Sequence, residues 1–230
     1  MDIIFYGDSL TKGNIGVSFF EILQKKLPNH NLVNRGRNGD TVTSLLRRIK
    51  RRHEDKEYDI AFLWIGTNDV LSCVSTLHKA TKMVCRQLWT EQVEEFNQQY
   101  RKALEITMRN AKKVYTVTPL LIDEDIENNW NIKLKILSTE IREISEDFES
   151  VEFIDIQKEF FKYLSEREAF EHRIKKRDLL LPLFLHKDNE YDNLSAKRGF
   201  FLTFDGVHLN SVGANIVAEI FYKKISEGRI

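Results

Sequence analysis

Short apolar runs alternate with longer amphipathic stretches from one end of the chain to the other. The runs are mostly bounded by Gly, Asn, Asp or Pro, which is typical of buried strands in a parallel sheet. They cover Ile3–Tyr6, Leu32–Val33, Ile60–Ile65, Val114–Val117 and Val151–Ile154. The pattern therefore predicts five short strands that are buried on both faces.

Between these runs, apolar residues recur every three to four positions, which is the spacing of one face of an α-helix. The helical sets are Phe19, Phe20, Leu23 and Leu27; Val93, Phe96, Tyr100 and Leu104; Ile132, Ile136, Leu137, Ile141, Ile144 and Phe148; and Val212, Ile216, Ile220 and Phe221. Alternating strands and helices imply right-handed crossovers and a three-layer α/β/α domain. Functional sites in such sheets lie beyond the carboxyl ends of the strands, so reactive residues should directly follow the apolar runs.

One stretch, Ser165 to Phe201, breaks this alternation. It combines a charged, helix-like segment with the apolar run Leu179–Leu185 and the polar stretch Lys187–Arg198. An insertion beside a site could form a lid or a wall of an acyl pocket, and an extra helix packed on the sheet edge explains it equally well. The chain contains no internal repeat and no low-complexity linker. We expect residues 1–230 to form a single domain with an insertion at 165–201.

The overall charge of the chain argues against a nucleic-acid partner. Thirty-five basic and 35 acidic residues cancel to a formal net charge of zero, so nothing draws the protein as a whole toward a polyanion. The one basic run, Arg47–Arg52, has no interleaved aromatic residues of the kind that stack on bases. We interpret it as the C-terminal end of a helix, where cations complement the helix dipole.

No segment approaches the roughly 20 apolar residues of a membrane span, so we expect no integral membrane association. The first residues lack the basic n-region of a signal peptide, which predicts a cytoplasmic protein unless a signal segment has been removed. Cys73 and Cys85 are too few for a disulfide framework and lack the clustered partners of a structural zinc site. The sequence therefore predicts no metal site.

Three motifs follow the first three predicted strands. After the first strand comes Gly7-Asp8-Ser9-Leu10, and a serine at a strand-to-helix turn can present its hydroxyl at the sheet edge. Gly39, after the second strand, can offer a backbone N–H group to an oxyanion, and the amide of Asn68, after the third, can donate into the same cleft. Taken singly, each motif is explained as well by an ordinary turn or helix cap.

A fourth motif, Asp205-Gly206-Val207-His208, precedes the last predicted helix. A spacing of three brings the Asp and His side chains to one side of a single turn, where the carboxylate can hold one imidazole nitrogen and leave the other facing a serine. The remaining histidines are interpreted as surface or structural residues: His30, His53, His78, His172 and His186. Together, the four motifs supply a nucleophile, a base, an orienting acid and two further donors at one sheet edge.

With these residues in view, the chain resembles the SGNH hydrolases, also called GDSL esterases, which are named for Ser, Gly, Asn and His in four sequence blocks. Ser9 matches the first block, Gly39 the second, Asn68 the third, and Asp205 with His208 the last. The resemblance spans nearly the whole chain apart from the insertion. It implies the SGNH hydrolase fold, a three-layer α/β/α sandwich around a flavodoxin-like, five-stranded parallel sheet of order 2-1-3-4-5. It also implies that no metal or organic cofactor is used.

The expected activity is esterase- or lipase-like, serine-dependent hydrolysis of carboxylic esters through an acyl-enzyme on Ser9. His208 is expected to act as base and Asp205 to orient it, while the N–H groups of Ser9 and Gly39 and the amide of Asn68 form an oxyanion hole. The partner would be a small-molecule ester: an acyl ester, an acetylated sugar or a lysolipid. Both an acetylesterase and a lysophospholipase suit this machinery, because specificity resides in the loops. The Leu179–Leu185 run slightly favours an acyl chain over a sugar, although a buried edge helix explains it as well. Neither the substrate-binding residues nor the oligomeric state can be read from the sequence.

Three other functions stay open. An acyltransferase would use the same acyl-enzyme and pass the acyl group to another alcohol. A non-catalytic, flavodoxin-like module could bind a phosphate or nucleotide, although Asp8, Asp40 and Asp69 in three of its loops would repel phosphate and no phosphate-binding loop motif is present. A catalytically silent interaction domain is disfavoured by the complete set of reactive groups.

Overall fold

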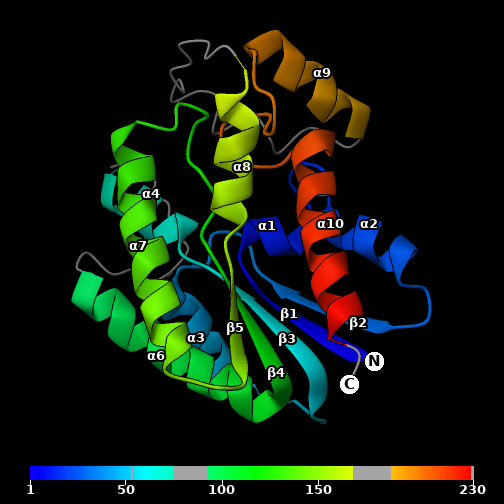
Figure 1. The fold of residues 1–230 in the computed structure, drawn as a ribbon, viewed down its shortest axis with the longest axis vertical. Helices are drawn as coiled ribbons and strands as arrows, with labels where there is room; N and C mark the ends of the chain where they lie inside the picture. The colour runs from blue at the N-terminus through cyan, green and yellow to red at the C-terminus, as the bar shows by residue number, and fades with distance from the viewer. Residues whose placement is uncertain (53, 75–92, 168–187, 229–230) are drawn as a thin grey trace.

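The computed structural model describes residues 1–52, 54–74, 93–167 and 188–228 (Figure 1). Five strands form one parallel sheet in the order β2-β1-β3-β4-β5. The strands are β1 (Asp2–Gly7), β2 (Asn31–Gly36), β3 (Tyr58–Trp64), β4 (Ala111–Val117) and β5 (Val151–Ile154). The predicted strands and the predicted strand order are confirmed.

Helices cover both faces of the sheet and complete the predicted three-layer sandwich (Figure 1). Helices α1, α2, α8 and α10 cover one face, and α3, α4, α6 and α7 cover the other. The helices are α1 (Ser9–Lys12), α2 (Phe19–Lys26), α3 (Val42–Arg51), α4 (Thr67–Val74), α6 (Val93–Asn110), α7 (Asn129–Glu146), α8 (Ile156–Ser165), α9 (Asp188–Arg198) and α10 (Ser211–Glu227).

The inner strands β1 and β3 are almost wholly apolar because they are buried on both faces. The edge strands β2 and β5 are only partly buried, so the predicted burial on both faces is wrong for these two. Successive side chains of a strand point to opposite sides of the sheet. Ile3 and Phe5 accordingly join the core under α2 and α10, whereas Ile4 and Tyr6 join the core under α3 and α6. A continuous apolar run is the pattern that such a strand requires.

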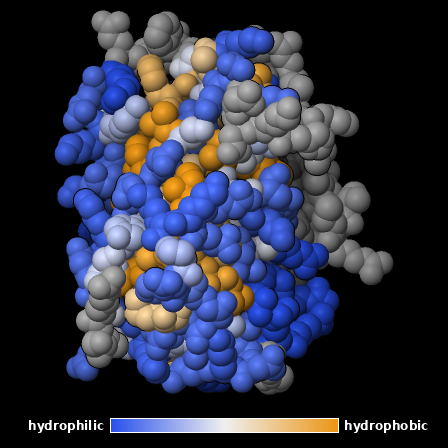
Figure 2. Space-filling view, turned by 90° about the vertical axis from the view of Figure 1, so that its right-hand side faces the viewer, coloured by the Kyte–Doolittle hydropathy of each residue, from blue (hydrophilic) through white to orange (hydrophobic). Residues whose placement is uncertain are grey.

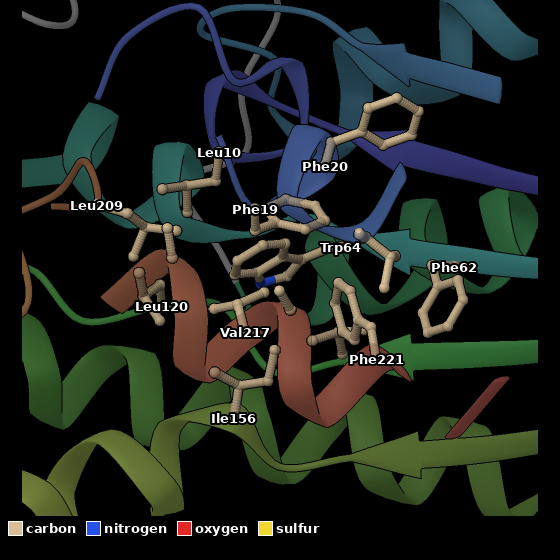
Figure 3. Packing of buried hydrophobic residues seen from close by; sticks show 14 of the residues in the cluster. Leu10, Phe19, Phe20, Phe62, Trp64, Leu120, Ile156, Leu209, Val217 and Phe221 are labelled. Atoms are coloured by element: carbon tan, nitrogen blue, oxygen red, sulfur yellow. The ribbon is translucent and has the colours of Figure 1, made fainter. Parts of the chain in front are cut away.

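Trp64, the last residue of β3, lies at the centre of the first of these cores (Figure 3). The rings of Phe19 and Phe221 meet it edge-on at centroid distances of 5.5 and 5.8 Å. Its indole Nε1 donates a hydrogen bond to the carbonyl of Thr118 at 2.8 Å, which satisfies the polar end of a buried aromatic ring. This packing fixes the end of β3 just before the Gly66-Thr67-Asn68 turn.

The predicted apolar face of α7 is wrong at two positions, since Ile132 and Ile136 are 44% and 46% exposed. The buried stripe instead runs through Leu134, Leu137, Ile141 and Ile144. The predicted set lacked Leu134. The helix buries the side that carries Leu134 and exposes the side that carries Ile132 and Ile136. Two apolar stripes on one helix leave the choice between them to the neighbouring elements. Val93 and Val212, predicted for the inner faces of α6 and α10, are also exposed.

The surface on the side of α2 and α10 is largely hydrophilic, with hydrophobic groups between hydrophilic side chains (Figure 2). The basic run Arg47–Arg52 falls at the C-terminal end of α3, which confirms its interpretation as a helix end. Within the described ranges, no helix combines the length and apolar character needed to cross a lipid bilayer.

Of the 165–201 stretch, the structure describes residues 165–167 and 188–201. The second of these parts contains α9, which lies next to the start of α10 (Figure 1). Asp192 of α9 accepts hydrogen bonds from the backbone N and the hydroxyl of Ser211, at 2.8 and 2.6 Å. Tyr191 packs against Phe204 with ring centroids 4.7 Å apart. The Leu179–Leu185 run lies outside the described residues. The role of this stretch as a lid or pocket wall, and the single-domain assignment of 1–230, stay predictions.

Candidate active site

Ser9 is the first residue of α1, directly after the turn that ends β1. Asp8 caps this short helix by accepting a hydrogen bond from the backbone N of Leu10 at 3.0 Å. Gly7 has no room for a side chain, because a Cβ atom there would lie 2.1 Å from the hydroxyl of Thr11 and 2.5 Å from the carbonyl of Trp64. The Gly-Asp-Ser sequence is therefore what this tight strand-to-helix turn requires.

The imidazole of His208 lies between Ser9 and Asp205. Ser9 Oγ is 3.1 Å from His208 Nε2, and His208 Nδ1 is 2.7 Å from Asp205 Oδ2. The other carboxylate oxygen of Asp205 accepts the backbone N–H groups of Val207 and His208 at 2.9 and 2.7 Å. Residues 199 positions apart in the sequence thus form one continuous hydrogen-bonded chain, with the imidazole within reach of the hydroxyl.

Burial and charge act in opposite directions on this pair. Burial tends to raise the pKa of the Asp205 carboxyl, but the His208 charge, its hydrogen bond and two backbone amides outweigh burial and lower that pKa. Burial tends to lower the pKa of the His208 imidazole, but the charge and hydrogen bond of Asp205, with the charge of Asp8, outweigh burial and raise it above the usual 6.5. The arrangement therefore keeps Asp205 ionised and makes His208 a stronger base than a free imidazole.

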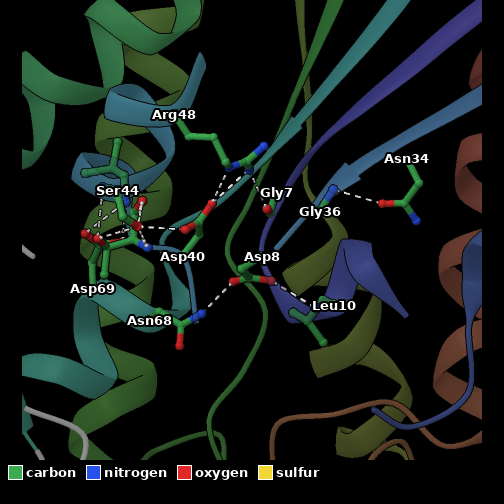
Figure 4. A network of polar contacts seen from close by, with 12 residues as sticks. Gly7, Asp8, Leu10, Asn34, Gly36, Asp40, Ser44, Arg48, Asn68 and Asp69 are labelled. Carbon is green, nitrogen blue, oxygen red and sulfur yellow. Dashed lines mark hydrogen bonds and ion pairs between the residues drawn. The ribbon is translucent and has the colours of Figure 1, made fainter. Parts of the chain in front are cut away.

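Asn68 lies in the first turn of α4 and is linked to the residue before Ser9 (Figure 4). Its side-chain Nδ2 donates to Asp8 Oδ2 at 3.0 Å. An amide nitrogen carries two hydrogens, so this bond orients the group and leaves a second hydrogen for a ligand. Asp8 thus joins two of the sequence motifs, a positioning role that the sequence analysis did not assign.

Gly39 lies in the turn after β2 and has a φ angle of +73°, in the left-handed region that favours glycine. The backbone N of Asp40 donates to the carbonyl of Arg37 at 3.1 Å and closes this turn. The backbone N of Arg37 in turn donates to the carbonyl of Gly7 at 3.1 Å. The loop that carries Gly39 is therefore fastened to the turn that carries Ser9.

Two further carboxylates hold the neighbouring loops in place (Figure 4). Asp40 is fully buried and accepts from Arg48 at 2.8 Å and from the hydroxyl of Ser44 at 2.9 Å. Asp69 accepts from the backbone N of Val42 at the start of α3, at 3.1 Å. Both acids are used within the protein to tie α3 to the loops around the site.

Glu124, which belongs to none of the four sequence motifs, secures the loop before Asp205. Its carboxylate accepts four hydrogen bonds of 2.7 to 2.8 Å, from the backbone N of Phe201, Leu202 and Thr203 and from the Thr203 hydroxyl. The adjacent Asp123 donates its backbone N–H to the carbonyl of Gly206 at 2.7 Å. The only signal in the sequence is that Glu124 follows the fourth strand, as the other motifs follow theirs.

The structure therefore brings Ser9, Asp205 and His208 into direct contact and links Asn68 and the Gly39 loop to the same turn through Asp8 and Gly7. In the described part of the chain, no three His, Cys, Asp or Glu side chains gather in a group that could hold a metal ion.

A family model described as the GDSL-like lipase/acylhydrolase family matches residues 5–216. The acetyl xylan esterase AlAXEase has a similar structure, with a TM-score of 0.70 and 23% identity over 98% of this chain and 100% of that one. A catalytic mutant of Axe2, an acetylxylan esterase from Geobacillus stearothermophilus, gives a TM-score of 0.69 with 19% identity over 97% and 93% of the two chains. LAE5, an alpha/beta hydrolase enzyme from the metagenome of Lake Arreo, Spain, gives 0.66 with 21% identity over 96% and 93%.

Among curated proteins, none matches the chain. The structural neighbours share the fold, and the family model spans most of the sequence, including every motif from the first strand to His208. The chain therefore belongs to the GDSL-like lipase/acylhydrolase family, whose members are carboxylic ester hydrolases.

Proposed function

We propose that the protein hydrolyses carboxylic esters through an acyl-enzyme on Ser9, with His208 as base and Asp205 as its orienting acid. The observation that carries this proposal is the hydrogen-bonded chain from Ser9 Oγ to His208 Nε2 and from His208 Nδ1 to Asp205 Oδ2. Asp205 accepts the Nδ1 proton, which leaves Nε2 as the nitrogen that can accept a proton from Ser9.

In the first half-reaction, Ser9 Oγ bonds to the ester carbonyl carbon while its proton moves to His208 Nε2. The electron pair of the carbonyl bond moves to oxygen, and the N–H groups of Ser9 and Gly39 with the amide of Asn68 stabilise this charge. The carbon–oxygen bond to the alcohol then breaks, and His208 returns the proton to the departing alcohol. Water repeats the sequence on the acyl-serine, which releases the carboxylic acid and restores the hydroxyl.

We propose a short acyl group, acetyl first, on a sugar. This rests on the names of the structural neighbours, two of which are acetyl xylan esterases, with whole-chain similarity to this protein in fold. A lysolipid or a longer acyl ester uses the same chemistry and would differ in how turnover depends on chain length. Transfer of the acyl group to a second alcohol would appear as a new ester when acceptor alcohols are added.

The decisive experiment compares the wild-type protein with Ser9→Ala on p-nitrophenyl acetate. The substitution should abolish turnover and also abolish covalent labelling by an organophosphonate, because both need the activated hydroxyl. Ser165→Ala, at the exposed end of α8, is the matched control and should keep both. Undiminished hydrolysis by the Ser9 variant would end the proposal. Butyrate and octanoate esters beside acetylated xylosides would then rank the acyl and alcohol preferences.

A further inference from the structure

A basic pocket of about 570 Å³ opens at the carboxyl end of the edge strand β2. Five cationic residues line it: Lys12, Arg35, Arg37, Arg48 and Arg52. Asn34, Gly36 and Asn38 complete the lining that the structure describes, which contains no acidic side chain. The positive charge is thus concentrated at this pocket, although the 35 basic and 35 acidic residues of the chain balance overall.

Within the ranges that the structure describes, three of these cations have acid partners and two do not. Arg35 forms a bidentate ion pair with Glu54, at 3.0 and 2.8 Å. Arg52 also contacts Glu54, at 3.2 Å. Arg48 is paired with Asp40. Among the described residues, no acid pairs with Lys12 or Arg37, and both side chains are exposed. The pocket therefore holds more positive charge than its own carboxylates neutralise.

Part of the pocket wall also contacts the turn that leads to Ser9, since Arg48 reaches the carbonyl of Gly7 (Figure 4). Lys12 ends the short helix that Ser9 begins, so the two residues lie about one helical turn apart, roughly 5 Å along the axis. Arg37 precedes Gly39 by two positions, and its backbone N donates to the carbonyl of Gly7. Lys12 and Arg37 are thus attached to the two turns that carry Ser9 and Gly39.

Helix α1 lies directly on the end of β2, which leaves this geometry little freedom. A Cβ atom on Gly36 would lie 2.3 Å from the backbone N of Lys12. The Asn34 side chain donates to the carbonyl of Thr11 at 2.7 Å. The backbones that present Lys12 and Arg37 are therefore fixed relative to Ser9, and only the two side chains need to move to meet a ligand.

We propose that this pocket binds an anionic group, a carboxylate or a phosphate, on the alcohol part of the ester, so that the preferred substrate is an acetylated acidic sugar. The inference rests on the proposed ester hydrolysis and adds the charge of the substrate to it. Guanidinium groups match carboxylate and phosphate oxygens in geometry as well as charge. Bound there, the anion would neutralise the charges of Lys12 and Arg37.

The experiment compares methyl glucuronoside with methyl glucoside, both acetylated at the same ring position. The two differ only at C6, which is a carboxylate in the first and a hydroxymethyl group in the second. An acetylated sugar phosphate is the third substrate. Its readout is the ratio of kcat/KM for each charged ester to kcat/KM for the neutral one. The wild-type protein should prefer a charged ester, and Lys12→Ala/Arg37→Ala should lower that ratio about three- to tenfold, mainly through KM, given the modest strength of exposed ion pairs. The preference should also shrink in about 1 M salt, where the Debye length is ~3 Å.

The matched control is Arg47→Ala/Lys50→Ala, which removes the same charge from exposed positions of α3 outside the pocket and should keep the wild-type ratio. The two charged esters distinguish a carboxylate from a phosphate as the preferred anion. A wild-type kcat/KM ratio of one for both charged esters, or an equal fall of the ratio in the two double variants, overturns the proposed anion binding. Ser9-dependent turnover of the neutral ester would still uphold the proposed hydrolysis. Absence of any Ser9-dependent turnover would instead overturn the hydrolysis on which the pocket rests.

Discussion

The two halves of the candidate site are held in place by different means. Ser9 and Asn68 form the sheet half. They follow β1 and β3, whose ends are aligned by the sheet, since Gly7 pairs with both Gly36 and Trp64. Asp205 and His208 form the loop half, which comes between α9 and α10 and not directly after a strand of the sheet. Their loop is secured by the four hydrogen bonds of Glu124 and by Asn210, which donates to the hydroxyl of Ser195 at 2.8 Å and to the carbonyl of Phe201 at 3.0 Å.

This difference determines how each half should respond to substitution. A sheet distributes its constraint over many backbone hydrogen bonds, so a side-chain change near β1 or β3 removes one donor and leaves the geometry intact. The loop of Asp205 and His208 depends on a few buried side chains that each make several bonds. Distant substitutions should therefore disturb the imidazole more readily than the serine.

The largest effect expected within this comparison is that of Asp205→Asn. An amide cannot hold the required tautomer of His208 or stabilise its positive charge, so kcat should fall about 10³–10⁴-fold with the fold intact. Steady-state kinetics on p-nitrophenyl acetate measure the loss, and circular dichroism reports the fold. Asp147→Asn, at an exposed acid paired with Arg101, is the control. A loss of less than tenfold would show that the loop half needs no orienting acid.

On the sheet half, Asn68→Ala should lower kcat by about 10²–10³-fold and leave KM nearly unchanged, because the lost donor acts on charge that develops only in the transition state. Asn215→Ala removes an exposed amide on α10 and should leave both constants unchanged. If KM alone rises, Asn68 binds substrate and does not stabilise the oxyanion. If the variant unfolds, the sheet half depends on single side chains and the comparison fails.

Glu124→Gln tests whether the loop half depends on a residue whose hydrogen bonds go to Phe201–Thr203 and not to Asp205 or His208. Burial raises the pKa of Glu124 and four hydrogen bonds counteract this. In the wild-type protein, four donors share the two carboxylate oxygens of Glu124, whereas glutamine offers only one acceptor oxygen. We therefore expect the variant to lose about 1–3 kcal/mol of stability and to have a roughly tenfold lower kcat. Urea unfolding and kinetics below the transition separate the two effects. Glu127→Gln, at an exposed acid, should change neither.

If Glu124→Gln loses stability but the kcat of the folded variant falls by less than the expected tenfold, the residue is purely structural. In that case Glu124→Asp, which keeps the charge and shortens the side chain, should recover stability without changing kcat further. A catalytic defect that follows the charge would instead make Glu124 a positioning residue of His208.

The sequence predicted what depends on local pattern and failed where two distant segments meet. The five strands and the Ser9 turn follow from runs and motifs that the chain displays within a few residues. The hydrogen bonds from Phe201–Thr203 to Glu124 join positions 77 to 79 residues apart, and no periodic pattern marks them. Which apolar stripe of α7 is buried depends on the elements packed against the helix. The basic pocket was missed for the same reason. Its Lys12, Arg37 and Arg48 come from three separate segments, and only the run around Arg48 stood out.

The smallest effect expected connects the two halves through charge. His208 must be neutral to accept the proton of Ser9, so kcat/KM should rise with pH through the pKa of the free enzyme's imidazole. Asp205 and, more weakly, Asp8 raise that pKa above 6.5, which places the midpoint of the acid limb above 6.5. Asp8→Asn keeps an oxygen for the Leu10 N–H group and removes one negative charge, so the midpoint should move to lower pH. Because Asp8 also orients Asn68, kcat on the plateau should fall as well. A lower plateau with an unmoved midpoint would show that Asp8 serves the sheet half alone and that its charge does not reach the imidazole.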